Sequence, residues 1–190
     1  MKSKKHISIF ASGNGSNAKA ILDFFKESEQ IIVSLIVSNK EAAGVLEIAR
    51  KNKIPTCVLS KEQLNKQEYL MPILEKAQID LIVLAGFLLL VPSYLVKSFP
   101  NRIINIHPAL IPKYGGKGMY GMKVHETVFQ NKEAETGITI HFVNEQYDEG
   151  EYILQKKVAI TSTDTPETIA SKVQKLEHEW FPKAVKRVLS

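Results

Sequence analysis

Asn105 and His107 form the pair of side chains in this sequence best placed to act on a ligand. They lie at the end of an apolar run and are followed by Pro108, which cannot continue a strand's hydrogen-bond ladder. Side chains alternate on a strand, so Asn105 and His107 share one face, whereas Ile104 and Ile106 share the other. Ligands of open α/β sheets bind at the carboxyl ends of the strands. The pair therefore indicates a binding or catalytic site. The alternative is that both groups hydrogen-bond to neighbouring loop backbone.

A glycine-rich turn, 12–17, stands between a strand expected at 6–11 and an amphipathic helix expected from about 18 to 27. Glycine lets the backbone approach an anion closely, and a free helix N-terminus favours negative charge. We expect Ser16 or Asn17 to cap this helix. The turn has two glycines rather than three, so a turn that merely requires glycine remains the alternative.

Strands and helices alternate along the rest of the chain, which is typical of a doubly wound α/β fold. We expect further strands at 31–37, 56–59, 81–85, 102–107, 137–143 and 153–160, and helices at 43–51, 61–77, 92–98, 122–131 and 166–188. Pro72 predicts a kink or break in the second of these helices. The short link between the last two strands predicts an antiparallel pair near one edge of a mostly parallel, seven-stranded sheet. The whole chain, 1–190, is expected to form one domain.

The composition is that of an ordinary globular domain. The 190 residues are 44% hydrophobic and 24% charged, and the formal net charge is +5. No apolar run reaches the ~18–20 residues that a membrane helix needs. The basic start, 1–5, lacks the apolar region and cleavage site of a signal peptide. We therefore expect a cytoplasmic protein that does not associate with membranes.

The titratable and thiol side chains exclude some classes of site. Cys57 is the single cysteine, so an internal disulfide is impossible, and its apolar surroundings favour an inert buried thiol. The five histidines are scattered and no cysteine pair accompanies them, so no metal site is expected. The net positive charge suits phosphorylated small molecules as well as nucleic acid. Because the lysines are mixed with glutamates and no arginine-rich run occurs, we do not expect a nucleic-acid partner.

Two further segments differ from their surroundings. The segment 113–121 holds four glycines and is expected to be a mobile loop, a loop moulded on a ligand, or a plain surface loop. His125, in the helix that follows, is expected on the surface or packed against the sheet. His141 lies on an alternating strand and is expected to be a satisfied core histidine.

Nearly the whole chain resembles the phosphoribosylglycinamide formyltransferase family, the folate-dependent enzymes of purine synthesis. The motifs that carry the resemblance are Ser12-Gly13-Asn14-Gly15-Ser16-Asn17, Leu84-Ala85-Gly86-Phe87, Asn105-Ile106-His107-Pro108, Ile111-Pro112-Lys113-Tyr114, His141-Phe142-Val143, Asp148-Glu149-Gly150 and Gln174 with Glu177-His178. The resemblance implies a Rossmann-like, formyltransferase-type fold. It also implies transfer of the formyl group of 10-formyltetrahydrofolate to the amine of 5'-phosphoribosylglycinamide.

The resemblance also implies a catalytic set of Asn105, His107 and Asp148. Asn105 would donate its amide N–H to the tetrahedral oxyanion, and a protonated His107 would donate to the same oxygen and later shuttle protons. Asp148 would raise the pKa of His107 and could hold a proton-relaying water. No metal and no covalent enzyme intermediate would be needed.

The same resemblance assigns the binding residues. The ribonucleotide and its phosphate would be held by Gly13, Asn14, Gly15, Ser16, Asn17, Gln174 and Glu177. The folate would lie along Phe87, Leu88, Leu89, Leu90 and Val91 and against the turn with Asn144, Glu145 and Tyr147. Thr139 and His141 would line the catalytic cleft behind the reacting groups. We expect a monomer or a weak homodimer.

The chain departs from the family at two places. A basic residue is common after Gly86-Phe87 in the family, whereas here the segment reads Leu88-Leu89-Leu90, which leaves contact with the folate's glutamate tail open. The loop 115–121 is longer than the commoner pattern, so its shape and any role of Lys117 do not carry over.

Three alternatives remain in view. The nearest is a hydrolase of the same fold that passes the formyl group to water; such relatives usually carry a domain ahead of this one, whereas here the first strand begins near His6. A nicotinamide-dependent oxidoreductase should have an acid at the end of the second strand, but 37–40 offers none. An RNA-binding module should show an aromatic and basic motif, which is not seen. The chain's end soon after the last helix also argues against a tRNA-directed relative.

Overall fold

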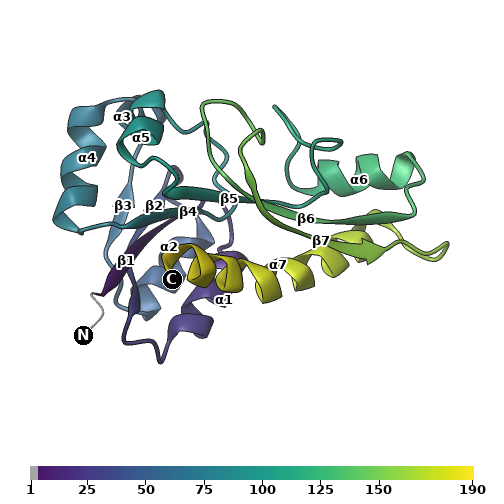
Figure 1. Ribbon diagram of the computed structural model, residues 1–190, viewed down its shortest axis with the longest axis horizontal. Coiled ribbons are helices and arrows are strands. Elements are labelled where there is room, and N and C mark those ends of the chain that lie inside the picture. Colours follow the sequence, from purple (N-terminus) through teal and green to yellow (C-terminus); the bar gives the residue numbers. More distant parts are fainter. Residues whose placement is uncertain (1–3) are drawn as a thin grey trace.

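Seven strands form one mixed sheet in the computed structural model, which describes residues 4–190 (Figure 1). The strands are β1 Lys5–Phe10, β2 Ile31–Ser38, β3 Thr56–Val58, β4 Leu81–Leu84, β5 Ile103–His107, β6 Glu135–Phe142 and β7 Tyr152–Ala159. Their order across the sheet is β3-β2-β1-β4-β5-β6-β7. The order reverses between β1 and β4, and such a reversal is where doubly wound folds bind ligands.

The pairing of the strands confirms the predicted architecture and adds one feature. The pairs β2–β3, β1–β2, β1–β4 and β4–β5 are parallel, and β6–β7 is antiparallel as expected. The pair β5–β6 is also antiparallel, and in it Asn105 faces His141 and His107 faces Thr139. The strand with the predicted site residues is therefore bordered by a strand that runs the other way and contributes a second histidine.

The helices cover both faces of the sheet. They are α1 Ser16–Phe25, α2 Gly44–Lys51, α3 Lys61–Leu64, α4 Gln67–Lys76, α5 Ser93–Ser98, α6 Met122–Gln130 and α7 Pro166–Leu189. Helices α1, α2 and α7 share one hydrophobic core with the sheet, whereas α3, α4 and α5 share the other (Figure 1). Strands that are covered on both faces read as continuous apolar runs, as β2 and β4 do.

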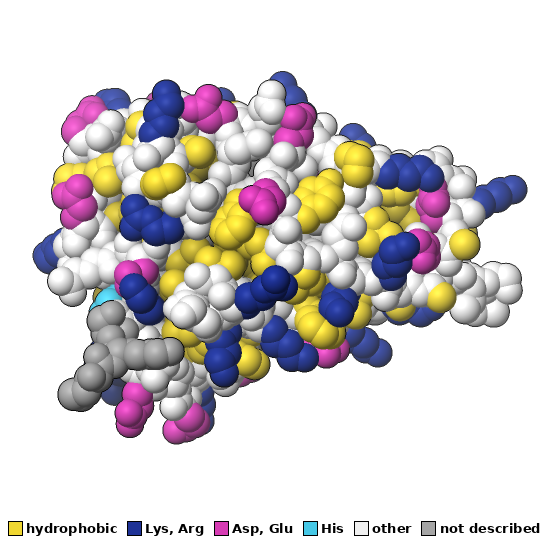
Figure 2. All heavy atoms as spheres, in the orientation of Figure 1, with side chains coloured by type: hydrophobic (Ala, Val, Ile, Leu, Met, Phe, Trp, Pro, Cys, Tyr) yellow, Lys and Arg dark blue, Asp and Glu magenta, His cyan; other side chains and the backbone are white. Residues whose placement is uncertain are grey.

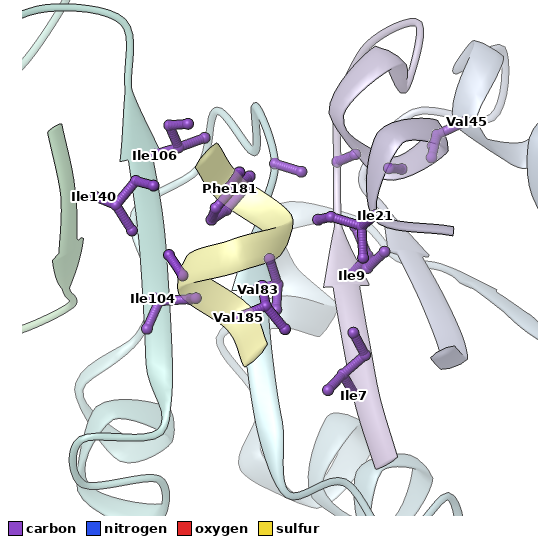
Figure 3. Close-up of a cluster of buried hydrophobic side chains, with 14 of the residues drawn as sticks. Ile7, Ile9, Ile21, Val45, Val83, Ile104, Ile106, Ile140, Phe181 and Val185 are labelled. Atoms are coloured by element: carbon purple, nitrogen blue, oxygen red, sulfur yellow. The ribbon is translucent and has the colours of Figure 1, made fainter. Parts of the chain in front are cut away.

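The core on the α7 side is built around Phe181, which is completely buried. Figure 3 shows Phe181 of α7 near Ile104, Ile106 and Ile140 of the sheet. Ile103 belongs to the opposite core. The predicted alternation along β5 is therefore confirmed, and Asn105 and His107 face away from the α7 core.

The segment 61–77 was expected to be one helix broken at Pro72, and the position of the break was wrong. The break falls at Asn65–Lys66, and Pro72 lies inside α4. The first turn closes on itself through a capping box, in which the Ser60 hydroxyl accepts from the Gln63 N–H and the Gln63 side chain accepts from the Ser60 N–H. Pro72 removes only one helical hydrogen bond, and α4 continues through it because its buried face packs on the sheet.

The final helix begins as predicted. Thr165 is its N-cap and accepts a hydrogen bond from the Thr168 N–H, and Pro166 occupies the first turn. Asp164, just before the cap, lies buried, where it pairs with Lys172 and accepts from the Thr161 N–H. In the part of the chain that the structure describes, no helix is long and apolar enough to cross a membrane.

We predict that Phe181→Ala lowers the free energy of unfolding by about 3–5 kcal/mol, because it removes a fully buried aromatic ring and leaves a cavity. Urea denaturation followed by circular dichroism measures the change. The matched control is Phe129→Ala in α6, whose ring is 43% exposed. Its cost should stay below about 1 kcal/mol. Equal losses in the two variants would contradict the assignment of the core.

Candidate active site

A cavity of about 830 Å³ opens at the carboxyl ends of β1, β4 and β5. Its wall is made by segments that follow these strands, by the glycine-rich loop before α6, by the turn after β6 and by one side of α7. These segments are 13–17, 84–91, 105–108, 116–122, 146–148 and parts of 170–177. The volume lies within the range of about 300–1,000 Å³ that is typical of small-molecule sites. The cavity is at the topological switch point, where the sequence analysis expected a site.

The turn after β1 presents the N-terminus of α1 to the cavity. Gly15 is the N-cap residue, with a φ of 79°, and a Cβ on it would lie 2.8 Å from the Cβ of Val45. Both the backbone conformation and the close approach therefore require glycine. The expectation that Ser16 or Asn17 caps the helix was wrong, since both lie within α1, and no side chain among the described residues caps it. Uncapped first-turn N–H groups suit an anion.

Residues of α7 meet α1 beside this turn. The Asn17 amide donates to Glu177 at 3.0 Å, and the Gln174 amide donates to the Ser16 hydroxyl at 3.4 Å. Burial raises the pKa of Glu177, although the hydrogen bond from Asn17 opposes this effect. A carboxyl group that ionises reluctantly is tolerated beside a bound anion better than a fully charged one. All seven residues assigned to the ribonucleotide are brought together in the cavity wall.

Asp148 connects the groups at the end of β5. One carboxylate oxygen accepts from the Gly116 N–H at 2.9 Å and lies 3.4 Å from Nδ1 of His107, and the other accepts from the Asn105 amide at 3.3 Å. Nε2 of His141 lies 3.5 Å from that second oxygen. Burial by itself raises the pKa of Asp148, but its hydrogen bonds and the neighbouring imidazoles outweigh burial, so the pKa lies below its usual value. Asp148 is therefore a carboxylate at neutral pH.

The turn after β6 brings Asp148 to this position through an unusual backbone conformation. Asp148 has a φ of 57°, in the left-handed region that aspartate adopts more readily than most residues. A Cβ on Gly150 would lie 1.6 Å from the carbonyl oxygen of Phe142, so the chain can return to β7 only through glycine. The Asp148-Glu149-Gly150 motif is thus a geometric requirement for placing the carboxylate.

Both amide protons of Asn105 are used within the protein. One is donated to Asp148 and the other to Nε2 of His141 at 3.2 Å. Nδ1 of His141 lies 2.8 Å from the carbonyl oxygen of Phe142 and must donate to it, which leaves Nε2 as an acceptor. His141 is therefore a satisfied histidine, as predicted, and it also orients the Asn105 amide.

His107 is buried between two acceptors. Its Nε2 donates to the Tyr114 carbonyl at 2.6 Å, and its Nδ1 faces Asp148. Asp148 acts on the pKa of His107 in the expected direction, upward, but it is not the largest influence. Burial lowers the pKa of His107, and the opposing effects of Asp148 and the Tyr114 carbonyl do not outweigh it. The ring is therefore mainly neutral at neutral pH, with its proton on Nε2.

The residues assigned to the folate divide into two groups. Phe87, Leu88, Leu89, Leu90 and Val91 line the cavity, as does Tyr147. Phe87 packs edge-to-face on Phe10, with ring centroids 5.4 Å apart, which fixes the start of this wall.

Three residues assigned from the resemblance lie outside the cavity wall. Asn144 accepts from the Gln146 N–H at 2.9 Å, and Glu145 pairs with Ser93 and Lys97. These two shape the turn. Thr139 is fully buried, donates to the Ala109 carbonyl and accepts from the Ile111 N–H. Thr139 therefore holds the segment that leaves β5.

The structure adds His125 and the loop 116–121 to the cavity wall. His125 is 6% exposed, its Nδ1 is buried, and no hydrogen-bond partner for that atom is found among residues 4–190. Burial, together with the neighbouring His107, lowers the pKa of His125. We expected His125 to lie on the surface or against the sheet, but not in a cavity wall. The spacing of the buried Val124 and Val128 would have placed His125 on the inner face of α6.

The cavity wall carries few basic side chains. Lys117 is the one Lys or Arg in the wall formed by described residues. Figure 2 shows Lys and Arg side chains scattered among acidic and neutral ones on the visible face. Within residues 4–190, no group of three or more His, Cys, Asp or Glu side chains is placed to hold a metal ion. Cys57 is buried, as expected, and burial raises the pKa of its thiol.

Comparison with known proteins gives a consistent result. Residues 5–185 match a family model described as "Formyl transferase". The chloroplastic phosphoribosylglycinamide formyltransferase of Arabidopsis thaliana is 42% identical over 188 residues, which are 96% of this chain and 64% of that protein. The phosphoribosylglycinamide formyltransferase of Bacillus subtilis is 37% identical over 190 residues, 97% of this chain and 95% of that protein. This chain thus spans less than two thirds of the plant relative's length and nearly all of the bacterial one's.

The fold is shared with solved structures. The crystal structure of phosphoribosylglycinamide formyltransferase from Bacillus halodurans superposes with a TM-score of 0.88 at 36% identity, covering 98% of this chain and 96% of that one. The corresponding structure from Anaplasma phagocytophilum gives a TM-score of 0.86 at 33% identity, covering 95% and 84%. The expected formyltransferase-type fold is therefore confirmed.

We predict that Glu177→Gln raises the unfolding temperature, and that its advantage over the unmodified chain grows from pH 5 to pH 8. A raised pKa means that the folded state prefers the protonated carboxyl, so this stabilisation is present at low pH and is lost as pH rises through the folded-state pKa. Glutamine keeps the shape without this loss. Calorimetric melting across the pH range measures it, and Glu179→Gln, on the exposed side of α7, is the control. A constant difference between Glu177→Gln and the unmodified chain would contradict the assignment.

Proposed function

The chain belongs to the formyl transferase family, and from this premise we propose that it transfers a formyl group from 10-formyltetrahydrofolate to the amine of 5'-phosphoribosylglycinamide, a step of purine biosynthesis. The observation that carries the proposal is the convergence of Asn105, His107 and Asp148 at one point of the cavity. The uncapped N-terminus of α1 and the apolar wall 87–91 line the same cavity.

The two halves of the cavity suit the two proposed substrates. The first turn of α1 offers N–H groups to the ribonucleotide's phosphate, and Gln174 and Glu177 lie within reach of its sugar. The wall 87–91 offers apolar side chains and backbone polar groups to a pterin ring. The exposed Leu88 and Leu90 extend this wall toward solvent. The reacting amine and formyl carbon would then meet beside Asn105.

The first chemical step is attack by the amine. The nitrogen lone pair bonds to the formyl carbon, and the carbonyl electrons move to oxygen, forming a tetrahedral oxyanion. Asn105 can donate to that oxygen if it turns one of its two N–H groups away from His141 or Asp148. Both of these hydrogen bonds, at 3.2 and 3.3 Å, are longer than usual and therefore weak. The loss of one such donor typically costs about 3–4 kcal/mol of transition-state stabilisation.

The second step moves a proton and breaks a bond. The attacking nitrogen has become positively charged and must lose a proton, which the His107–Asp148 pair can accept because Asp148 is ionised and Nδ1 of His107 is unprotonated. The pair then returns the proton to the departing folate nitrogen as the carbon–nitrogen bond breaks. The products are the formylated amine and tetrahydrofolate.

The expectations about the exact formyl donor, the cellular location, the partners and the assembly state stay predictions. The family supports a folate-derived formyl donor, and the identity of the donor as 10-formyltetrahydrofolate belongs to this proposal. The scheme needs no metal and no covalent enzyme intermediate. A cytoplasmic location, the absence of a nucleic-acid partner, a single domain and a monomer or weak homodimer are carried forward unchanged.

We predict that His107→Ala and Asp148→Asn each lower kcat by about a hundredfold or more, because each removes a member of the proton-transfer pair. The assay follows tetrahydrofolate production with the ribonucleotide present, and formate release without it. His6→Gln, at the opposite end of β1, is the control and should keep full activity. Normal transfer in either site variant would refute the catalytic assignment. Formate release that does not need the ribonucleotide would favour the hydrolase alternative.

We predict that Asn17→Ala raises the KM for the ribonucleotide at least about tenfold more than the KM for the folate, because Asn17 lies in the first turn of α1 and orients Glu177. Steady-state kinetics with each substrate varied in turn give both values. Equal changes in the two KM values would remove Asn17 from the phosphate half of the cavity.

A further inference from the structure

Ser12 is the first residue of the glycine-rich turn 12–17. Its hydroxyl, however, contacts the wall 87–91, in the other half of the cavity. It is 3% exposed, and it is not part of the cavity wall. Its hydroxyl accepts from the Leu88 N–H at 3.0 Å and donates to the Asn39 side-chain oxygen at 2.5 Å. Its own N–H donates to the Gly86 carbonyl at 3.0 Å. Three segments, after β1, β2 and β4, therefore meet at one buried hydroxyl.

These contacts continue the β1–β4 pairing beyond the ends of the strands. Phe10 pairs with Leu84 in the sheet, and the Ala85 N–H donates to the Phe10 carbonyl. Gly86 then turns with a φ of 75°, and the chain leaves the sheet. Beyond this turn, the Leu88 N–H is held by the Ser12 hydroxyl. Ser12 therefore fixes the position of the start of the wall 87–91.

The direction of the hydroxyl is set by Asn39. A serine hydroxyl has one proton and two lone pairs. Because the proton is donated to Asn39, a lone pair remains for the Leu88 N–H. Removing Asn39 as an acceptor would free the hydroxyl to rotate and would weaken its hold on Leu88.

The phosphate half of the turn is held by separate contacts. The Gly13 carbonyl accepts from the Val45 N–H at 3.2 Å, and Gly15 packs directly on Val45. Helix α2 therefore fixes that half, independently of the Ser12 hydroxyl. A change at Ser12 should disturb the wall 87–91 and leave the N-terminus of α1 in place.

We propose that Ser12 is a positioning residue for the wall 87–91, to which the folate binds. Its hydroxyl, oriented by Asn39, fixes the position of the Leu88 backbone against which the pterin binds. The inference rests on the proposed function and deepens it. Ser12 belongs to the glycine-rich motif by sequence, but its effect is on the formyl donor. It acts through Leu88 and does not itself contact substrate or the reacting atoms.

The test compares Ser12→Ala with two variants of its partner, Asn39→Ala and Asn39→Asp. Ser12→Ala leaves the Leu88 N–H without its acceptor, and should weaken tetrahydrofolate binding and raise the KM of the formyl donor about tenfold. The KM for the ribonucleotide should change little. Asn39→Ala should give a smaller change in the same direction. Asn39→Asp keeps an oxygen acceptor for the hydroxyl and should bind tetrahydrofolate as the unmodified chain does.

Calorimetric titration with tetrahydrofolate, in the absence of catalysis, separates this inference from the proposed function. If the unmodified chain binds no tetrahydrofolate and transfers no formyl group, the proposed function fails. If it binds tetrahydrofolate and both alanine variants bind tetrahydrofolate as tightly as the unmodified chain does, only the role of Ser12 is overturned. Equal effects of Ser12→Ala on both substrates, or a lowered melting temperature with unchanged binding, would also overturn it, because either result describes a purely structural hydroxyl.

Discussion

The site depends on one buried carboxylate and the groups that compensate its charge. Asp148 remains ionised because the Gly116 N–H and the Asn105 amide donate to it, while His107 and His141 lie beside it as neutral rings. Each of these groups comes from a different segment: the glycine-rich loop, β5 and β6. The carboxylate therefore fixes the relative positions of the parts that carry the proposed chemistry, and the left-handed backbone at Asp148 is tolerated because these contacts hold it.

The proposed catalytic donors are paired within the protein. The two amide N–H groups of Asn105 donate hydrogen bonds to His141 and Asp148. The Nε2–H of His107 donates a hydrogen bond to the Tyr114 carbonyl. Buried donors without partners would destabilise the fold, so these internal acceptors keep the polar groups buried and oriented. Exchanging a long internal hydrogen bond for a short one to an oxyanion is favourable only when negative charge develops on that oxygen, which is the property required of a catalyst.

Helix α7 connects stability to binding. Phe181 lies in the core beneath the sheet, whereas Gln174 and Glu177, about two turns and one turn earlier, reach the cavity and contact α1. The apolar packing of one end of the helix thus holds the other end in place, and it supports a half-buried acid whose ionised form is disfavoured. A site residue that costs stability is expected where binding requires it.

The sequence by itself determined the doubly wound class, the alternation that puts Asn105 and His107 on one face, and the glycine-rich turn before α1, because strand periodicity and turn chemistry act over a few residues. Only the tertiary structure decided the location of the break before α4, the inward position of His125, the lowered pKa of His107 and the link from Ser12 to Leu88. These features depend on burial and on contacts between residues as far apart as 76 positions. Local pattern contains no information about such distances, and the energy of a charge or hydrogen bond depends on what surrounds it.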